Sequence, residues 1–123
     1  MATLGDRVFD NGLSVLDTEA DKVLVTSQEA TTFTEANSTY ALGNSGSLSI
    51  GASSDRTGGG RKVAVAAISD GAITATGTAT HYAIVDTANS RLLVTAALSA
   101  GQSVTNGNTF TLATFDVGIP DPA

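Results

Sequence analysis

The amino-acid sequence predicts an all-β protein, a sandwich or barrel of short antiparallel strands. Along several short segments apolar residues alternate with polar ones, most regularly over residues 72–80. A period of two residues is typical of a half-buried strand, whereas a helix has a period of about 3.6. Turn signals made of Gly, Asn and Asp separate these segments. Folds of this class hold roughly eight to ten short strands.

The first third of the chain is predicted to contribute a hairpin and an irregular strand. Asp10-Asn11-Gly12 is a turn signal, and residues 13–16 after it are a short strand candidate. A polar loop at residues 17–21 leads to a returning strand at residues 22–26. Residues 28–40 contain many β-branched Thr side chains, which favours a strand over a short helix.

Residues 43–62 differ in composition from the rest of the chain. They are rich in Gly and Ser, and such segments behave as flexible linkers rather than packed elements. Leu48 and Ile50, spaced two residues apart, could form a brief strand within them. Long loops in compact domains are usually functional or disordered. We therefore expect a long Gly/Ser-rich loop or flexible arm here.

The middle of the chain is predicted to contain two strands. Residues 63–68 are continuously apolar, which indicates a strand buried on both faces. Asp70-Gly71 is a hairpin turn signal. From residue 74 to residue 80 every second residue is Thr, and residues 73, 75, 77 and 79 are Ile, Ala, Gly and Ala. The Thr side chains should share one face, and the small residues should lie against a closely approaching layer or beside a crowded contact.

The C-terminal third is organised as strands around two reversals. Two apolar runs flank the loop at residues 86–90, which is the pattern of a β-hairpin with a longer loop. Asn106-Gly107 marks a second tight reversal. In the last strand, Phe110 and Leu112 differ in parity from Phe115 and Val117. A single bulge near residues 113–114 would bring all four side chains to one face.

The chain also contains an internal echo. Residues 15–26 align without gaps on residues 84–95, with Asp, Thr, a basic residue and Leu-Val-Thr at matching places. Two copies are too few for a solenoid. We interpret them as two equivalent hairpins, and the alternative is chance similarity between hairpins of like composition.

Length and composition predict one small domain that needs support. The 123 residues suffice for a single β domain, residues 1–123, which ends in a short tail at residues 118–123 where two prolines stop the last strand. Aromatic residues are only 5% of the chain and many apolar residues are alanine, so the core has few large anchors. We expect help from oligomerisation or from docking onto something larger.

Charge and residue usage argue against several classes of function. The net charge of −6 argues against binding to nucleic acid or to an anionic membrane surface. The absence of cysteine excludes disulfides, a thiolate nucleophile and Cys-ligated zinc. The first residues lack the pattern of a signal peptide, and no apolar run reaches the ~20 residues that span a bilayer. We expect synthesis and assembly on the cytoplasmic side.

No motif predicts a catalytic, cofactor or metal site. Asp17, Glu19 and Asp21 alternate, but the Gly and bidentate Glu of a calcium-binding EF-hand loop are missing. We expect the Asp side chains of this loop and of residues 86–89 to accept backbone N–H bonds. His81 is the only histidine, and no Gly-x-Ser-x-Gly elbow accompanies it. A hydrolase based on Ser and His81 is therefore the least favoured hypothesis.

The strongest candidate for a partner-binding site is basic. Residues 58–62 look superficially like a phosphate loop but lack its Gly-Lys-Ser/Thr ending and precede a strand, which favours a flexible hinge. Arg56, Arg61 and Lys62 nevertheless hold half of the six basic residues of the chain. They could contact an acidic partner surface, together with Leu48 and Ile50 of the same arm.

Four segments of the C-terminal half resemble a known protein family. These are residues 71–86 (GAITATGTATHYAIVD), 90–93 (SRLL), 107–112 (GNTFTL) and 115–120 (FDVGIP). They are similar to small β-rich structural proteins of tailed bacteriophages and prophages. The likeness covers roughly the last half of the chain, and the rest more loosely. The family has no catalytic motif to carry over.

The resemblance implies a structural protein of the virion without enzymatic activity. A head decoration (cement) protein, made in the host cytoplasm and bound to the outer surface of the head, is the first expectation. Its partners would be the major capsid protein lattice and copies of itself, with a trimer suggested by analogy. The alternative is a head-fibre, tail or baseplate accessory protein that binds a receptor or carbohydrate. Sparse aromatic residues count against the alternative, unless Tyr40 and Tyr82 meet in an open groove.

Overall fold

The computed structural model describes residues 6–46 and 48–119, and most of the chain forms antiparallel β-sheets. Strands account for 53% of the residues, which confirms the predicted all-β class. Contacts divide the chain into two compact units, each built from segments that are distant in sequence. The second unit consists of residues 20–48 and 68–112, and the remainder belongs to the first. The single domain stays a prediction.

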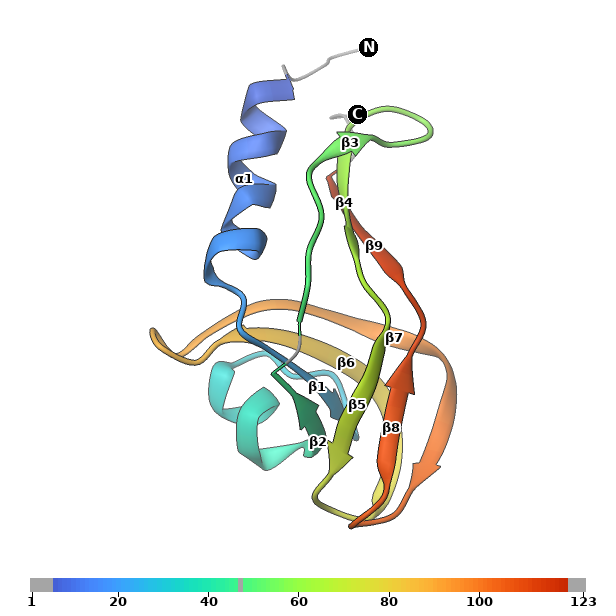
Figure 1. Ribbon diagram of the computed structural model, residues 1–123. Coiled ribbons are helices and arrows are strands. Elements are labelled where there is room, and N and C mark those ends of the chain that lie inside the picture. The colour runs from blue at the N-terminus through green and yellow to red at the C-terminus, as the bar shows by residue number, and fades with distance from the viewer. Residues whose placement is uncertain (1–5, 47, 120–123) are drawn as a thin grey trace. The chain divides into compact units, whose positions relative to one another are not determined.

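The first unit combines one helix with a three-stranded sheet (Figure 1). Helix α1 spans Asp6–Glu19, and it packs through Leu13 and Leu16, which are spaced to share one face. The strands run in the order β3-β4-β9, with β4 paired antiparallel to both neighbours. Val63 and Val65 of β4 supply the buried face of the sheet. The strands span Ser54–Asp55 (β3), Arg61–Val65 (β4) and Phe115–Ile119 (β9).

The predicted turn at residues 10–12 and strand at residues 13–16 are wrong, because both lie within α1. Leu13 and Leu16 are buried, whereas Ser14 and Asp17 are exposed. Burial at a spacing of three residues fits a helix and not a strand. The free energy gained by burying one face of the helix therefore outweighs the local preference of these residues for a turn.

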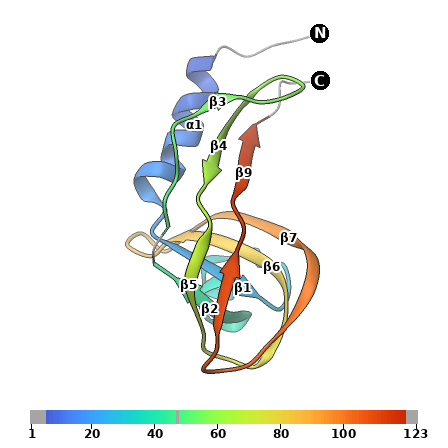
Figure 2. The same cartoon turned by 45° about the vertical axis from the view of Figure 1, so that its right-hand side comes forward.

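The second unit is a six-stranded antiparallel sheet in the order β7-β6-β1-β2-β5-β8. Strand β1 coincides with the strand predicted at residues 22–26, and it lies in the middle of the sheet. The long edge strand β7 bends along its length, so that the sheet curls (Figure 2). The strands span Lys22–Thr26 (β1), Ala41–Ser45 (β2), Ile68–Ile73 (β5), Gly77–Asp86 (β6), Arg91–Val104 (β7) and Thr109–Leu112 (β8).

Both faces of this sheet are buried around β1. Leu24 pairs with Ala83 of β6, and on this face they pack with Ala30 and Ala36 from the segment between β1 and β2. Val23 pairs with Ile84 on the other face, and both side chains are fully buried. The core of the second unit therefore has two layers, separated by the sheet itself.

The strand predicted at residues 28–40 is wrong, because this segment forms a π-helical turn, η1 (Glu35–Thr39). The Tyr40 backbone N–H donates to the Glu35 carbonyl oxygen at 2.8 Å, five residues earlier. Thr31 donates its N–H and its hydroxyl to the Glu35 carboxylate at 2.9 and 2.7 Å. Thr side chains that bond locally in this way compete with a sheet ladder, so their β propensity does not decide the conformation.

The hairpin predicted around residues 86–90 is confirmed as β6 and β7. Asp86 accepts the N–H groups of Ala88 and Asn89 at 3.1 and 3.3 Å, as expected of an Asp that begins a turn. The reversal at Asn106-Gly107 is also confirmed, with Gly107 at φ 94°. The echo does not mark two equivalent hairpins, because residues 15–19 belong to α1.

The middle strands follow the predicted parity but not the predicted boundaries. Residues 63–68 divide between β4 and β5 and alternate in burial, so they are not buried on both faces. Asp70-Gly71 lies inside β5 instead of at a turn. Residues 72–80 are interrupted at positions 74–76, and the Thr positions are more exposed than the Ile and Ala positions between them.

The predicted bulge at residues 113–114 is wrong. Val65 pairs with Phe115 and Ile68 with Leu112, so two residues face two and none is extra. The register shifts instead between Ile68 and Gly71, where two residues of β5 face one residue of β8. Strands β8 and β9 belong to different sheets, which explains their opposite parity.

The expected Gly/Ser-rich arm at residues 43–62 is not seen as a separate loop. Strand β2 extends through Ser45, and Ile50 forms an isolated bridge with Val65. The Gly51 N–H donates to the Ala64 carbonyl oxygen at 2.9 Å, and β3 completes the segment. In the predicted tail at residues 118–123, the first two residues belong to β9 and the last four lie outside the described residues.

Replacing Gly12 by Ala should stabilise the protein by up to about 1 kcal/mol, because Ala is the better helix former. A Cβ at position 12 would meet the Ile119 Cδ1 at 3.4 Å, which is ordinary contact. The matched control is Gly107→Ala. A Cβ at position 107 would meet no other atom, but Gly107 has a φ of +94°, so the backbone strain of an Ala there should destabilise the protein. Urea unfolding measures both free energies. A destabilising Gly12→Ala would contradict the helix.

Replacing Gly71 by Ala should destabilise the protein by about 1–3 kcal/mol through overpacking. The ring of Phe110 lies directly over Gly71, so close that a Cβ there would overlap the ring unless it moved. The double variant Gly71→Ala/Phe110→Leu should cost less than the sum of the single variants, because the smaller side chain relieves the overlap. Urea unfolding of all three variants tests this coupling, and strict additivity would contradict it.

Candidate functional site

The three predicted basic residues gather on the hairpin formed by β3 and β4, residues 54–62, which we call the basic hairpin. Ser54 pairs with Lys62, and Asp55 pairs with Arg61. The Arg56 N–H donates to the Gly60 carbonyl oxygen at 3.0 Å and closes the turn. The hairpin therefore brings together Arg56, Arg61 and Lys62, as the sequence analysis anticipated for a partner-binding segment.

Three consecutive glycines shape the turn of the basic hairpin. Gly58, Gly59 and Gly60 have φ values of 90°, 104° and 95°, a region that residues with a side chain rarely adopt. The turn is tied to Arg56, whose carbonyl oxygen accepts the Gly59 N–H at 3.1 Å. The Arg56 Nη1 in turn donates to the Gly59 carbonyl oxygen at 3.0 Å. Backbone geometry thus accounts for the glycine run.

Carboxylates compensate two of the three cations. Arg61 Nη1 lies 2.8 Å from the Asp55 Oδ1, and Lys62 Nζ lies 3.1 Å from the Asp116 Oδ2. The side chain of Asp55 is 89% exposed, so this pair contributes at most about 1 kcal/mol. No carboxylate forms an ion pair with Arg56 among the residues that the structure describes. Among the described residues, Arg56 is therefore the cation of the hairpin that has no ion pair.

An open hollow of about 400 Å³ adjoins these groups. It is lined by Arg56, Thr57, Lys62, Asp116 and Gly118. Asp116 and Gly118 come from β9, which pairs with β4. Sequence reasoning missed both residues, because no local signal connects Lys62 with a carboxylate 54 positions later. The hollow thus contains the Arg56 guanidinium and, beside it, the Lys62 ammonium group paired with the Asp116 carboxylate.

The two apolar residues of the predicted site do not join the basic hairpin's hollow. Ile50 belongs to the first unit and forms its bridge with Val65. Leu48 belongs to the second unit. Both side chains are half-buried. The hollow itself is therefore built from polar and basic residues, without Leu48 or Ile50.

His81 has a simple local environment on β6. Its Nδ1 lies 2.8 Å from the Thr80 hydroxyl, which donates to the Ser27 carbonyl oxygen at 2.9 Å. Within residues 6–46 and 48–119, no three His, Asp or Glu side chains cluster as a metal site would require. Among the described residues, the hydrogen-bonding neighbour of the His81 ring is thus a hydroxyl and not a carboxylate.

Tyr40 and Tyr82 do not meet in a groove. Tyr40 packs against the cluster that contains Leu24 and Ala83. Tyr82 is the next residue to Ala83 on β6, so its side chain points to the opposite face of the sheet. Because the two rings lie on opposite faces of the sheet, they do not form the open aromatic groove that a carbohydrate site at these two residues would need.

Asp21 connects the start of β1 to the turn between β6 and β7. Its carboxylate accepts the Thr87 N–H at 3.0 and 3.2 Å and the Thr87 hydroxyl at 2.6 Å. The bond from the Thr87 hydroxyl is the largest of the effects that lower the pKa of Asp21 below its ordinary value of 3.8, and burial opposes it. The ionised carboxylate thus joins two segments that are 66 residues apart.

Replacing Asp21 by Asn should lower thermal stability at neutral pH, because a charged acceptor is exchanged for a neutral one. A lowered pKa in the folded state means that the stabilisation is present above the unfolded value of 3.8 and is lost as the pH falls through the folded value. The difference from the wild type should therefore disappear in stronger acid. Thermal melts across pH test this, with Asp17→Asn on exposed helix as control. Equal melting temperatures of Asp21→Asn and the wild type at neutral pH would contradict a stabilising role of the Asp21 carboxylate.

Comparisons with protein-family models, with curated proteins and with solved structures find no match for this chain. No helix in the described part of the chain is both long and apolar enough to cross a membrane. A function must therefore be argued from the residues of the site and from the resemblance in the C-terminal half.

Proposed function

We propose that the chain is a non-enzymatic structural protein of a tailed phage particle, a decoration protein on the outer surface of the head. The observation that carries the proposal is the resemblance of residues 71–86, 90–93, 107–112 and 115–120 to small structural proteins of such particles. These segments correspond to parts of β5 to β9. The resemblance therefore concerns four of the six strands of the larger sheet and one strand, β9, of the smaller sheet.

The architecture supports a scaffold role. Strand β6 pairs with β1 and β7, and β4 pairs with β3 and β9, so the resembling strands are held by antiparallel ladders. Polar side chains at the turns are bonded internally, as Asp86 is to Ala88 and Asn89. A stable β body without a demand for moving parts suits a protein that covers another surface.

The basic hairpin is the contact that we propose for the capsid lattice. The chain as a whole carries a net charge of −6, whereas Arg56 has no carboxylate partner among the described residues. An acidic capsid surface would repel most of the protein and attract the hairpin, which orients docking. A lattice offers many equal sites, so copies that associate, as a trimer would, gain from multivalency.

Copy number on the particle tests the proposed role and its location. The chain should co-sediment with intact, DNA-filled particles from its source in hundreds of copies, and particles stripped of it should lose DNA on mild heating. A few copies confined to the tail would favour the alternative, a fibre, tail or baseplate accessory protein. Absence from the particle would contradict both roles.

Charge variants test the basic hairpin on stripped particles. Arg56→Glu should weaken rebinding by about tenfold or more, because it reverses the uncompensated charge. Asp116→Asn should strengthen rebinding, because it removes the carboxylate beside Lys62. The matched control is Arg91→Glu, an equal charge change at an exposed position of β7 in the other unit. Equal losses for Arg56→Glu and Arg91→Glu would contradict a specific contact.

A further inference from the structure

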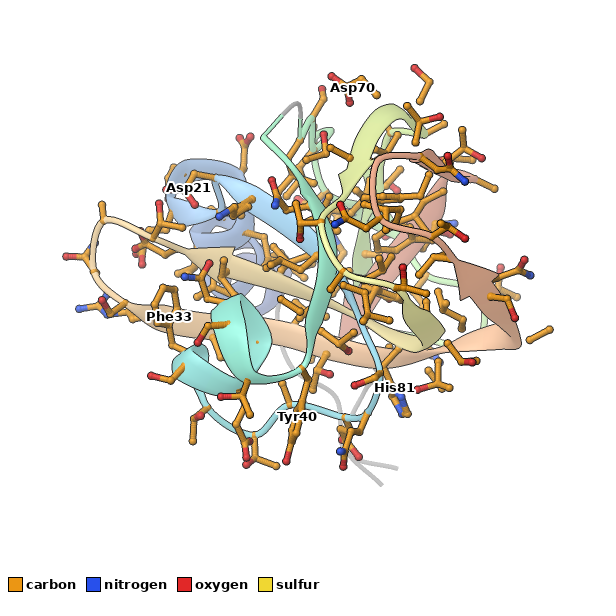
Figure 3. All side chains as sticks on the ribbon, turned by 90° about the horizontal axis from the view of Figure 1, so that it is seen from below. Asp21, Phe33, Tyr40, Asp70 and His81 are labelled. Atoms are coloured by element: carbon orange, nitrogen blue, oxygen red, sulfur yellow. The ribbon has the colours of Figure 1, made fainter. Side chains whose placement is uncertain are left out.

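The second unit contains an open, polar hollow of about 610 Å³ that neither the proposed function nor the sequence analysis uses. Its position can be followed from Asp21 and Phe33 in Figure 3. We call it the Phe33 groove. The residues that matter for its chemistry are Asp21, Lys22, Phe33, Asn37, Asn44 and Gly46.

Four separate elements build the Phe33 groove. Lys22 of β1 and Asn44 of β2 share the sheet face of Leu24, because Leu24 pairs with Asn44. Phe33 precedes η1 and Asn37 lies within it, on the segment that packs over this face. The turn between β6 and β7, held by Asp21, completes the lining. The residues that line the groove thus lie on segments whose backbone is held in place by the hydrogen bonds of the sheet.

Phe33 supplies an apolar surface inside this polar hollow. Its side chain is half-buried and packs against the cluster that contains Ala36 and Val85. Because the ring is already held on one side by its packing, it loses little further conformational entropy when a ligand contacts its open side. Phe33 is therefore suited to stack against an apolar face of a small ligand.

The charges of the groove compensate each other. Asp21 is ionised and bonded to Thr87, and Lys22 Nζ donates to the Asn37 Oδ1 at 3.3 Å. One carboxylate and one ammonium group leave no net charge, so the groove does not favour an anion or a cation over a neutral molecule. The carboxamides of Asn37 and Asn44 add both donors and acceptors.

We propose that the Phe33 groove binds a neutral saccharide. A sugar ring has one face of C–H groups, which fits the exposed part of Phe33, and a rim of hydroxyls that donate and accept hydrogen bonds. Carboxylate and carboxamide groups are complementary to such hydroxyls, because each offers two polar atoms in one plane. The size of the groove is in the range of small-molecule sites. The proposal does not depend on capsid decoration, and it differs from the discarded site at Tyr40 and Tyr82.

Gly46 allows the groove to be blocked without disturbing the fold. A Cβ at this position would meet only the Asp21 carbonyl oxygen, at 4.0 Å, so a larger side chain enters open space. Gly46→Leu should therefore obstruct the groove. The matched control is Gly51→Leu in the first unit, where a Cβ would meet the Ala64 carbonyl oxygen at 3.8 Å. The two substitutions add the same volume at two exposed glycines.

The experiment is an NMR titration of the ¹⁵N-labelled chain with four separate probes: D-glucose, D-galactose, N-acetyl-D-glucosamine and inorganic phosphate. At least one sugar should produce saturable shifts at residues of the Phe33 groove, with a dissociation constant of millimolar order for so small a ligand. The shifts should persist in Gly51→Leu and disappear in Gly46→Leu. Asn44→Ala should weaken binding by about tenfold, because hydroxyl partners are lost.

Three results would overturn the proposal. The first is the lack of saturable shifts with any of the sugars. The second is saturation by phosphate alone, which would identify an anion site. The third is sugar binding that survives Gly46→Leu unchanged, which would place the sugar elsewhere on the chain. The spectra of both Leu variants also report whether each still folds, so a loss of binding is separated from a loss of structure.

Discussion

The pairing of β1 with β6 is the interaction on which the second unit depends. Val23, Leu24, Val25 and Thr26 are all buried, so β1 contributes side chains to both layers of the core at once. A strand with two buried faces fixes its register firmly, because a slip by one residue would exchange the two layers. The buried Thr26 is satisfied, since its hydroxyl donates to the Gln28 carbonyl oxygen at 2.8 Å. The position of Lys22 in the Phe33 groove follows from this register.

The two candidate sites depend on different kinds of order. In the basic hairpin, glycine φ values and a ladder of short strands hold Arg56 beside its turn. In the Phe33 groove, the lining residues come from four elements that meet only after the sheet has formed. The hairpin is therefore a local feature of the sequence, whereas the groove is a product of tertiary structure.

This difference explains how much the sequence could predict. Local patterns correctly predicted β1, the hairpin of β6 and β7 and the reversal at Gly107. Features that depend on distant partners were missed. The turn signal at Gly12 led to a wrong prediction, because this segment is part of helix α1. The helix buries Leu13 and Leu16 against a sheet that is formed by later residues, which the local sequence does not show. Asp116 and Phe33 likewise gain their importance only from neighbours that are remote in sequence.

The division of the chain has a consequence for biosynthesis. The first unit needs α1, β4 and β9, and β9 ends at Ile119 while α1 begins at Asp6. Because α1 is synthesised before β4 and β9, its sheet cannot be complete until β9 has followed. Until β9 is available, the side of α1 that carries Leu13 and Leu16 lacks its sheet, which leaves it as a transient target for chaperones.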